Sequence, residues 1–460
     1  MIMYKNLYQI KTATIFFVMF LAVGYLHAQE NQRMVFAHYM VGMPMYGDAS
    51  SVTVADLKKD IIDANDQGIN AFQINIHDWK ERKSRQVTAR LYQAASECDF
   101  PFYLFPSVDY NENDGTRWLY EDIYEYMRLY AKHPNHLQVD DRPFFTSWLG
   151  QLKGVDFWRS IKDRLRKELG LDIYYVPFHA ITFKQTPEEI EEYLDKWDDV
   201  IDGYFSWGAS RPPFFTGPSK WASITEANEN MSAALKSRDL SYMTPVIPAF
   251  WATCKLPCKY TEHKGATGMK TQWMSIINNQ TAQWVNLVTW NDMGEDSHWS
   301  PHPNPNRLTH EGPVWTHAGY AELNKYYIQW WKSGQQPPIN RDKLFYFYRN
   351  QFQDATPLKE SCPHECIRHI PDKVYVTTML TSPAKLTIKS GSKITVHNVP
   401  TGIHYWEGEL GIGKQHFIIA RDGKVVIDVT SKETIDKKPE YKSWSLYSGF
   451  AEAKFNNNRK

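Results

Sequence analysis

Short apolar runs alternate with amphipathic stretches from residue 34 onward, and the alternation repeats about eight times. An apolar run bounded by polar turns predicts a buried strand, whereas apolar residues every three or four positions predict a helix. Their alternation predicts parallel strands joined by helices, so we expect an α/β fold, a (β/α)8 TIM barrel. The predicted strands are Met34–Met40, Ile69–Ile76, Phe102–Val108, Pro143–Trp148, Ile173–Phe178, Val200–Trp207, Tyr242–Phe250 and Trp284–Trp290.

Capping residues support the predicted helices. Thr53 stands three positions before Asp56, and Thr186 stands three positions before Glu189, which is the spacing of a capping box. A third helix is predicted over Val155–Leu169, where apolar residues share one face. Long helices between short apolar strands favour a parallel sheet over a sandwich.

The pattern changes near Gln335–Pro338. Helical periodicity fades there, and alternating strands such as Lys385–Ile388 and Lys393–Val396 follow. We therefore predict a (β/α)8 barrel over residues 33–336 and a small all-β, sandwich-like domain over residues 340–455. The glycines expected in its hairpin turns are Gly391, Gly402, Gly411, Gly413 and Gly423.

The first 28 residues have the form of a cleaved signal peptide. Lys5 and Lys11 precede the apolar run Ile15–Val23, and Leu26-His27-Ala28 stands before Gln29. The run is short for a membrane span, so we expect a secreted protein, periplasmic or extracellular, with no span after cleavage. An uncleaved membrane anchor is the alternative.

Charge and aromatic content narrow the class of partner. Basic and acidic residues number 52 each, and loss of Lys5 and Lys11 with the leader leaves a small acidic excess. This balance argues against a nucleic-acid partner. Aromatic residues make up 15% of the chain, and their flat faces suit the C–H faces of sugar rings. Composition therefore favours a carbohydrate partner.

The chain has five cysteines, of which four form two closely spaced pairs. In an exported protein Cys254 with Cys258, and Cys362 with Cys366, are candidates for local disulfides, and Cys98 is expected as a buried thiol on a helix. A zinc site of four thiolates is the alternative, which the placement of the pairs in different predicted domains disfavours.

Polar residues gather just past the predicted strands, most clearly in Trp290–Glu295 (WNDMGE). The carboxyl ends of barrel strands open into one cleft, so side chains distant in sequence meet there. Two carboxylates, Asp292 and Glu295, suit hydrolysis of a sugar acetal, because one can protonate the leaving oxygen while the other activates water. The residues expected to hold the sugar are His38, Tyr39, Asn75, Asp109, Trp148, Trp207, Trp251, Trp290, Asn291 and His298, with His77 and Asp78 beside them.

Several of these residues have a structural interpretation as well. Asp109 suits a turn, and His38 suits a core position with a hydrogen-bonded ring. Trp207 and Trp251 suit packing at the barrel rim as well as stacking on sugar. These alternatives stay open at the level of sequence.

Histidines follow the last predicted strand at positions 298, 302, 310 and 317. They resemble a metal-binding cluster, but their proline-rich spacing fits no compact ligand motif. We therefore expect no metal ion at these histidines.

Four segments together resemble one family. Val35–Gly42, Gly68–Asn75 and Asp202–Trp207 are similar to its first, second and sixth strands, and Trp290–Glu295 is similar to its most distinctive motif. From about Val35 to Phe450 the chain resembles glycoside hydrolase family 71, the α-1,3-glucanases also called mutanases. The β-rich tail is similar to the family's accessory module.

The resemblance implies a (β/α)8 barrel that hydrolyses α-1,3-glucosidic bonds in a polysaccharide, endo-acting and inverting, with no cofactor. We expect it to act as a monomer. An inverting pair stands roughly 6.5–9.5 Å apart to admit water. The preferred assignment makes Glu295 the general acid and Asp292 the base or the residue that positions it. Asp78 is the rival base from across the barrel, and Asp109 a weaker one.

Two departures from the family pattern affect this transfer. The loop Ile76–Trp79 is shorter than usual, which bears on Asp78. Asp296 stands between Glu295 and Ser297, where the family more often has Ser directly after Glu. Two other functions stay open: a barrel glycosidase for another α-linked glucan or a mannan, and a non-catalytic surface glycan-binding protein. The pairing of two carboxylates weighs against the second.

Overall fold

The computed structural model describes residues 33–110, 117–181, 186–208, 211–214, 223–252, 259–279, 282–302, 308–309, 312–359 and 370–454. The predicted leader and the candidate disulfide residues Cys254, Cys258, Cys362 and Cys366 lie outside these ranges. None of the helices within these ranges combines the length and apolar character that a membrane crossing needs. Cys98 is a half-buried thiol just past a helix, and its Sγ–H donates to the carbonyl of Ala94.

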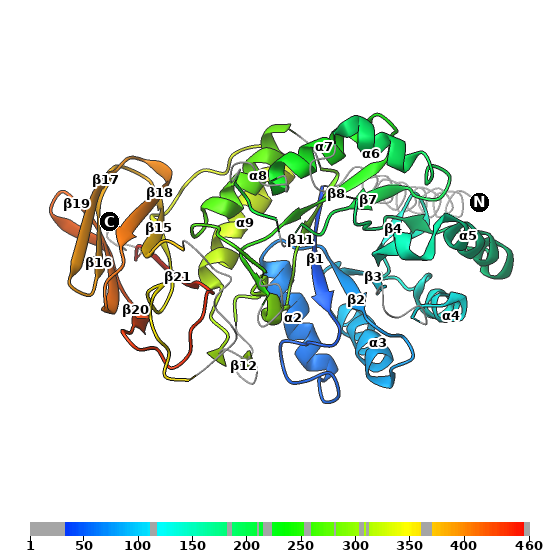
Figure 1. Cartoon of the computed structure of the whole chain (residues 1–460), viewed down its shortest axis with the longest axis horizontal. Coiled ribbons are helices and arrows are strands. Elements are labelled where there is room, and N and C mark those ends of the chain that lie inside the picture. The colour runs from blue at the N-terminus through cyan, green and yellow to red at the C-terminus, as the bar shows by residue number, and fades with distance from the viewer. Residues whose placement is uncertain are drawn as a thin grey trace, which may run out of the picture.

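The α/β fold is confirmed. A curled nine-stranded sheet has the order β4-β5-β3-β2-β1-β11-β8-β7, with β6 paired to β5, and all strands but the edge strand β4 run parallel. The helices surround these strands (Figure 1). The strands are β1 (Met34–Met40), β2 (Ala71–Ile76), β3 (Tyr103–Asp109), β4 (Gln138–Val139), β5 (Arg142–Trp148), β6 (Tyr174–Tyr175), β7 (Gly203–Phe205), β8 (Ser241–Val246) and β11 (Trp284–Leu287). We call residues 34–333 the strand-and-helix part.

Main-chain hydrogen bonds connect the segments around β6 and β7. Asp202 N–H donates to Tyr175 O at 2.8 Å, and Phe205 N–H donates to Pro177 O at 3.0 Å. Because β6 pairs with β5 and β7 pairs with β8, these bonds link the two ends of the sheet. The sheet is therefore curled, with the segments around β6 and β7 in contact.

Local sequence signals explain the helices. The capping boxes of Thr53 with Asp56 and of Thr186 with Glu189 are both present, and the helix predicted over Val155–Leu169 has those bounds. The helices are α2 (Val54–Asp66), α3 (Arg82–Ser96), α4 (Tyr120–Tyr130), α5 (Val155–Leu169), α6 (Pro187–Leu194), α7 (Ile224–Lys236), α8 (Thr267–Asn279) and α9 (Ala318–Ser333).

Several predicted strands are wrong in their extent: β6, β7 and β11 are shorter than predicted, and one predicted strand is divided. The run Tyr242–Phe250 divides into β8 and a separate strand β9 (Phe250–Ala252), which forms a hairpin with β10 (Lys259–Thr261). The side chain of Gln272 binds both the N–H and the carbonyl of Ile247, so it replaces a neighbouring strand there. Pro248, which has no N–H, follows at the break.

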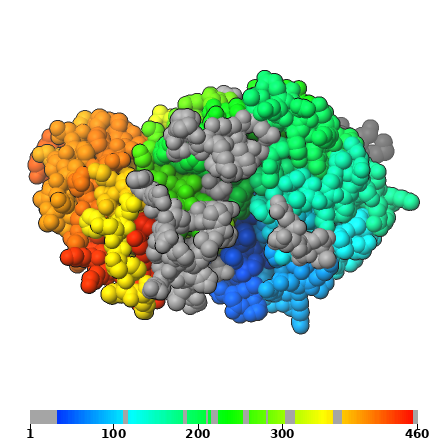
Figure 2. All heavy atoms as spheres, viewed as in Figure 1, coloured from blue at the N-terminus to red at the C-terminus, as the bar shows by residue number. Residues whose placement is uncertain are grey.

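The short strands β12 (Leu308–Thr309) and β13 (Gly312–Pro313) pair with each other. The eight strands after them form two antiparallel four-stranded sheets, which we call the β-rich part (residues 343–452). One has the order β18-β15-β14-β21 and the other β17-β16-β19-β20. In the space-filling view its yellow and orange surface adjoins the green surface of the strand-and-helix part (Figure 2). The strands are β14 (Lys343–Tyr348), β15 (Lys373–Leu380), β16 (Ala384–Ser390), β17 (Lys393–Val399), β18 (Gly402–Glu409), β19 (Gly413–Arg421), β20 (Lys424–Ile435) and β21 (Tyr447–Glu452).

Strand β14 separates two apolar cores. Leu344 and Tyr346 pack in the core between the two β-sheets, whereas Phe345 and Phe347 belong to the core of the strand-and-helix part. The ring of Phe347 lies 4.6 Å from that of Tyr320 in α9. Successive side chains of a strand point to opposite faces, so the alternation in this strand attaches one part to the other.

Candidate active site

The turn after β11 carries the two predicted catalytic carboxylates. Met293–Glu295 forms a single 3-10 turn, and Asp292 caps it by accepting a hydrogen bond from the Glu295 N–H at 3.1 Å. Asp292 N–H in turn donates to Thr289 Oγ1 at 2.8 Å. Asp292 is buried and Glu295 half-buried. The backbone thus holds Asp292 firmly, while the Glu295 side chain is the more exposed of the two.

Asn291 fastens this turn to the first strand. Its Oδ1 accepts from Met40 N–H at 2.7 Å, and its Nδ2 donates to the carbonyls of Met40 and Met43. The side chain is fully buried. The structure therefore gives Asn291 a positioning role, and the predicted contact with sugar stays a prediction.

Tyr39 and Trp290 lie between the sheet and α2. Both are fully buried, and both donate to the carboxylate of Asp60, Tyr39 Oη at 2.9 Å and Trp290 Nε1 at 3.2 Å. Burial raises the pKa of Asp60 to about 7. The structure does not bring these two rings to the strand ends as a pair of sugar contacts.

His38 belongs to a polar layer inside the sheet. Its Nδ1 donates to Gln73 Oε1 at 2.7 Å, and Asn286 Nδ2 donates to the same oxygen at 2.7 Å. Gln73 Nε2 donates to Thr146 Oγ1 at 2.9 Å. Burial lowers the pKa of His38 to about 4, so the ring is neutral at ordinary pH. The rings of His38 and Trp207 pack in a T-shaped arrangement, with their centroids 4.6 Å apart.

Four other predicted cleft residues stand near the carboxyl ends of β2, β3 and β5. Asp109 pairs with Trp148 across these strands, and Asp109 Oδ2 lies 3.5 Å from His77 Nδ1. Trp148 is half-buried and stacks on Phe178 with ring centroids 6.1 Å apart. Asn75, at the end of β2, is buried. The structure thus brings Asp109, Trp148 and His77 together.

Asp78 lies on the side of α4. Its Oδ1 accepts from Lys80 N–H at 2.8 Å, and its charge helps raise the pKa of Asp122, after the larger effect of burial. Trp251 is far from this position in the sequence. It is buried on β9, where it packs with Ile370 and Trp444 of the β-rich part. The structure therefore brings Trp251 into a packing cluster rather than to the strand ends.

His298 is fully buried next to Asp296 and His317, with one potential ligand atom of each within 4.8 Å of the others. In the sequence, Asp296 is only a departure from the family pattern, and the proline-rich spacing of the histidines fits no compact metal-ligand motif. Two further residues were missed, Gln73 and Asp60. The sequence feature that could have indicated them is a polar residue within an otherwise apolar strand or helix face.

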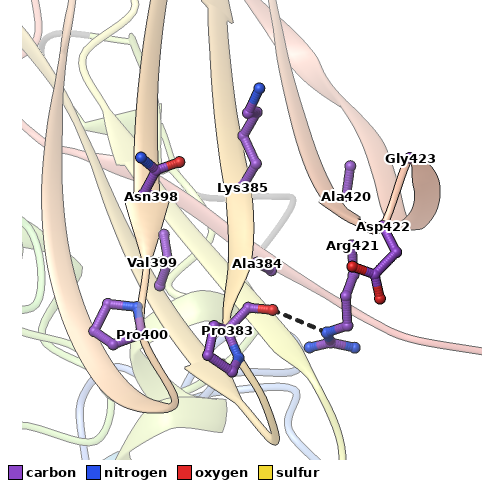
Figure 3. Close-up of a pocket in the computed structure, with 10 residues that line it drawn as sticks. All are labelled: Pro383, Ala384, Lys385, Asn398, Val399, Pro400, Ala420, Arg421, Asp422 and Gly423. Atoms are coloured by element: carbon purple, nitrogen blue, oxygen red, sulfur yellow. Dashed lines mark hydrogen bonds between the residues drawn. The ribbon is translucent and has the colours of Figure 1, made fainter.

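A hollow of about 640 Å³ lies away from these residues, in the β-rich part (Figure 3). It is lined by side chains such as Lys385, Asn398 and Arg421, and Arg421 Nε donates to the carbonyl of Pro383 at 3.1 Å. Its lining contains no aromatic ring. A sugar chain would find no stacking surface in it.

Comparison with known proteins finds a family model and relatives that match most of the chain. Residues 31–460 match the model of glycosyl hydrolase family 71. A mutanase of Penicillium rubens is 26% identical over 92% of this chain and 90% of its own length. A glucan endo-1,3-alpha-glucosidase of Schizosaccharomyces pombe is 24% identical over 95% of this chain and 98% of its own length.

Among solved structures, a GH99 endo-alpha-mannosidase from Bacteroides thetaiotaomicron is similar with a TM-score of 0.51. The sequences are 12% identical, and the match covers 65% of this chain and 98% of that one. At this identity the likeness concerns the fold alone.

Proposed function

The chain belongs to glycosyl hydrolase family 71, and on that premise we propose that this glycoside hydrolase cleaves α-1,3-glucosidic bonds within α-1,3-glucan, acting inside the chain and with inversion. The observation that carries the proposal is the turn after β11, where Asp292 and Glu295 are held by a direct backbone hydrogen bond. The names of the two fungal relatives support the substrate.

The proposed reaction uses one carboxyl group as a proton donor and the other as a proton acceptor. Glu295, protonated, gives its proton to the glycosidic oxygen as the bond from C1 to that oxygen breaks. Asp292, ionised, takes a proton from a water molecule that attacks C1 from the opposite face. The new sugar end then carries the β configuration. Asp78 is the alternative base, from the end of β2, with Asp292 then positioning Glu295.

We also propose the finer architecture that this function needs. The hydrogen bonds between the β6 and β7 regions support a closed (β/α)8 barrel over residues 33–336. The two antiparallel sheets support a β domain over residues 340–455. Export by the leader at residues 1–28 would bring the enzyme to an insoluble polysaccharide substrate. We propose that it acts there as a monomer.

The test follows the sugars released from insoluble α-1,3-glucan by NMR, before mutarotation mixes the anomers. Release of β-anomeric oligosaccharides is the expected result. Release of α-anomers would contradict inversion. A panel of other α-glucans and α-mannan runs in parallel, and cleavage of one of these alone would contradict the substrate. Binding of glucan without any release would indicate a glycan-binding protein instead.

A further inference from the structure

Three buried side chains meet directly after the catalytic turn. Asp296 follows Glu295 in sequence, and its backbone ends the 3-10 turn with a left-handed φ of 51°. One potential ligand atom each from Asp296, His298 and His317 lies within 4.8 Å of the other two. The three residues are 5%, 0% and 0% exposed. The cluster is therefore not solvated by bulk water.

Each imidazole has one nitrogen fixed by a backbone carbonyl. His317 Nδ1 donates to His298 O at 2.7 Å, and His298 Nε2 donates to Trp315 O at 3.2 Å. A carbonyl only accepts, so these two nitrogens carry the hydrogens. The opposite nitrogens, His298 Nδ1 and His317 Nε2, are buried without a hydrogen-bond partner among the described residues. A carbonyl on one ring nitrogen is the usual device for orienting a histidine toward a metal.

The other atoms of the cluster are acceptors too. Asp296 Oδ1 lies 3.3 Å from His317 Nε2. A carboxylate oxygen and two imidazole lone pairs thus come together in a buried place, which is costly unless a cation joins them. Bonds of about 2.1 Å to a tetrahedral zinc ion place neighbouring ligand atoms about 3.4 Å apart. The distance between Asp296 and His317 already matches that spacing.

We propose that Asp296, His298 and His317 bind one divalent transition-metal ion. Two imidazoles and a carboxylate suit zinc best among the metals commonly bound by proteins. Tyr320 stands beside the site, with its ring 5.1 Å from that of His317 and a buried hydroxyl that has no partner among the described residues. The fourth ligand is this hydroxyl or a water molecule.

The ion would join the catalytic turn to α9. His317 precedes the first residue of α9 and Asp296 ends the turn that carries Glu295, so a shared ion fixes one against the other. The role is structural, because none of the three ligands touches the sugar in the proposed mechanism. The rings of His298 and His317 are stacked, 3.8 Å apart and 5° from parallel. Both lone pairs can point at one ion only if the rings tilt, so the zinc-loaded protein should have a larger angle.

The experiment measures bound metal and thermal stability rather than glucan cleavage, so its outcome is independent of the proposed substrate. The full chain is produced without a polyhistidine tag in zinc-supplemented medium and dialysed. We expect one zinc ion per chain at this site, and a Tm that falls by several degrees with EDTA and recovers with zinc. His317→Gln should lose one zinc per chain and the response to EDTA.

His136→Gln is the matched control. His136 is also a buried histidine, but both of its ring nitrogens have partners, Tyr92 Oη at 2.8 Å and Phe144 O at 3.2 Å. This variant should keep its zinc even if its Tm falls. Asp296→Asn, which is nearly isosteric, replaces His317→Gln if the latter fails to fold.

Substitution with cobalt distinguishes a metal bound at this site from a metal bound by cysteines. Cobalt bound by nitrogen and oxygen absorbs in the visible range without the intense near-ultraviolet bands of cobalt thiolates. We expect that nitrogen–oxygen spectrum in the wild type and in His136→Gln only. Equal zinc content in wild type and His317→Gln, with a Tm that ignores EDTA, would overturn the proposal. A proton shared by Asp296 and His317 would then take the place of the ion.

Discussion

The side chains of Asp292 and Glu295 differ in how the backbone holds them. Asp292 accepts the Glu295 N–H, whereas Glu295 is the more exposed carboxylate. Glu295→Gln cannot donate an acidic proton, so kcat on α-1,3-glucan should fall by about 10²–10⁴-fold with glucan binding retained. Asp292→Asn should lower kcat as strongly.

The control for these two variants is Asp78→Asn, assayed with the same substrate. Turnover should stay within a few-fold of wild type if Asp292 is the base. A loss with Asp78→Asn that matches the loss with Asp292→Asn would move the base to β2. Near-normal turnover in both Glu295→Gln and Asp292→Asn would exclude the turn from the chemistry.

Asp60 predicts a dependence of stability on pH. Its pKa rises from 3.8 to about 7 on folding, so the folded state binds the proton more tightly. The stability that Asp60 contributes is complete below about pH 4 and is lost as pH rises through about 7. Asn resembles the protonated acid. Asp60→Asn should therefore lose less stability than wild type between pH 5 and pH 8, as measured by urea unfolding across that range.

The outcome that contradicts this prediction is a pair of parallel curves of unfolding free energy against pH. Tyr39→Phe offers a comparison, since it removes the hydroxyl that donates to Asp60 and leaves the carboxyl in place. Because this hydrogen bond lowers the pKa of Asp60 against the larger effect of burial, that variant should lose at least as much stability with rising pH as the wild type.

Residue roles were the least predictable feature from sequence. Trp290 and Asn291 stand next to the carboxylates in the chain, yet one packs against α2 and the other binds the end of β1. Both residues lie past the end of β11, where the chain turns, so neighbours in a motif need not share a cleft. The contacts of Asp60 and Gln73 were invisible because their partners are distant in sequence.

Elements were far more predictable, because their signals are local. Every predicted strand has a counterpart, and the caps at Thr53 and Thr186 lie where the spacing placed them. The failure at β8 has a non-local cause, since Gln272 of α8 supplies the hydrogen bonds of Ile247. Nothing in the apolar run itself marks that replacement.

The cap of α2 gives a prediction at this scale. Thr53 Oγ1 accepts from Asp56 N–H at 3.2 Å, and Asp56 returns a bond to Thr53 N–H at 3.1 Å. Thr53→Ala should lower the free energy of unfolding by roughly 0.5–2 kcal/mol, because an N-terminal donor loses its partner. Chemical denaturation measures the loss, and Thr53→Ser should restore most of it. Equal losses in both variants would mean that the methyl group, not the hydroxyl, matters.

A buried ion pair joins the two parts of the molecule. Arg349, 5% exposed at its side chain, binds Glu262 at 2.7 Å from the segment after β10. Glu262→Gln would leave the guanidinium charge uncompensated, so the free energy of unfolding should fall by about 3–5 kcal/mol. Glu409→Gln breaks the exposed pair with Lys373 and should cost less than about 1 kcal/mol. Similar effects of the two variants in urea unfolding would contradict this account.

The two-faced strand β14 has a consequence for recombining this protein with its relatives. The linker at Gln335–Pro338 looks like a natural place to join halves of two parents. A junction there, however, would pair Phe345 and Phe347 of one parent with Tyr320 of the other. Hybrids should fold well only when α9 and β14 come from the same parent. The exchanged segment should therefore include both sides of the linker.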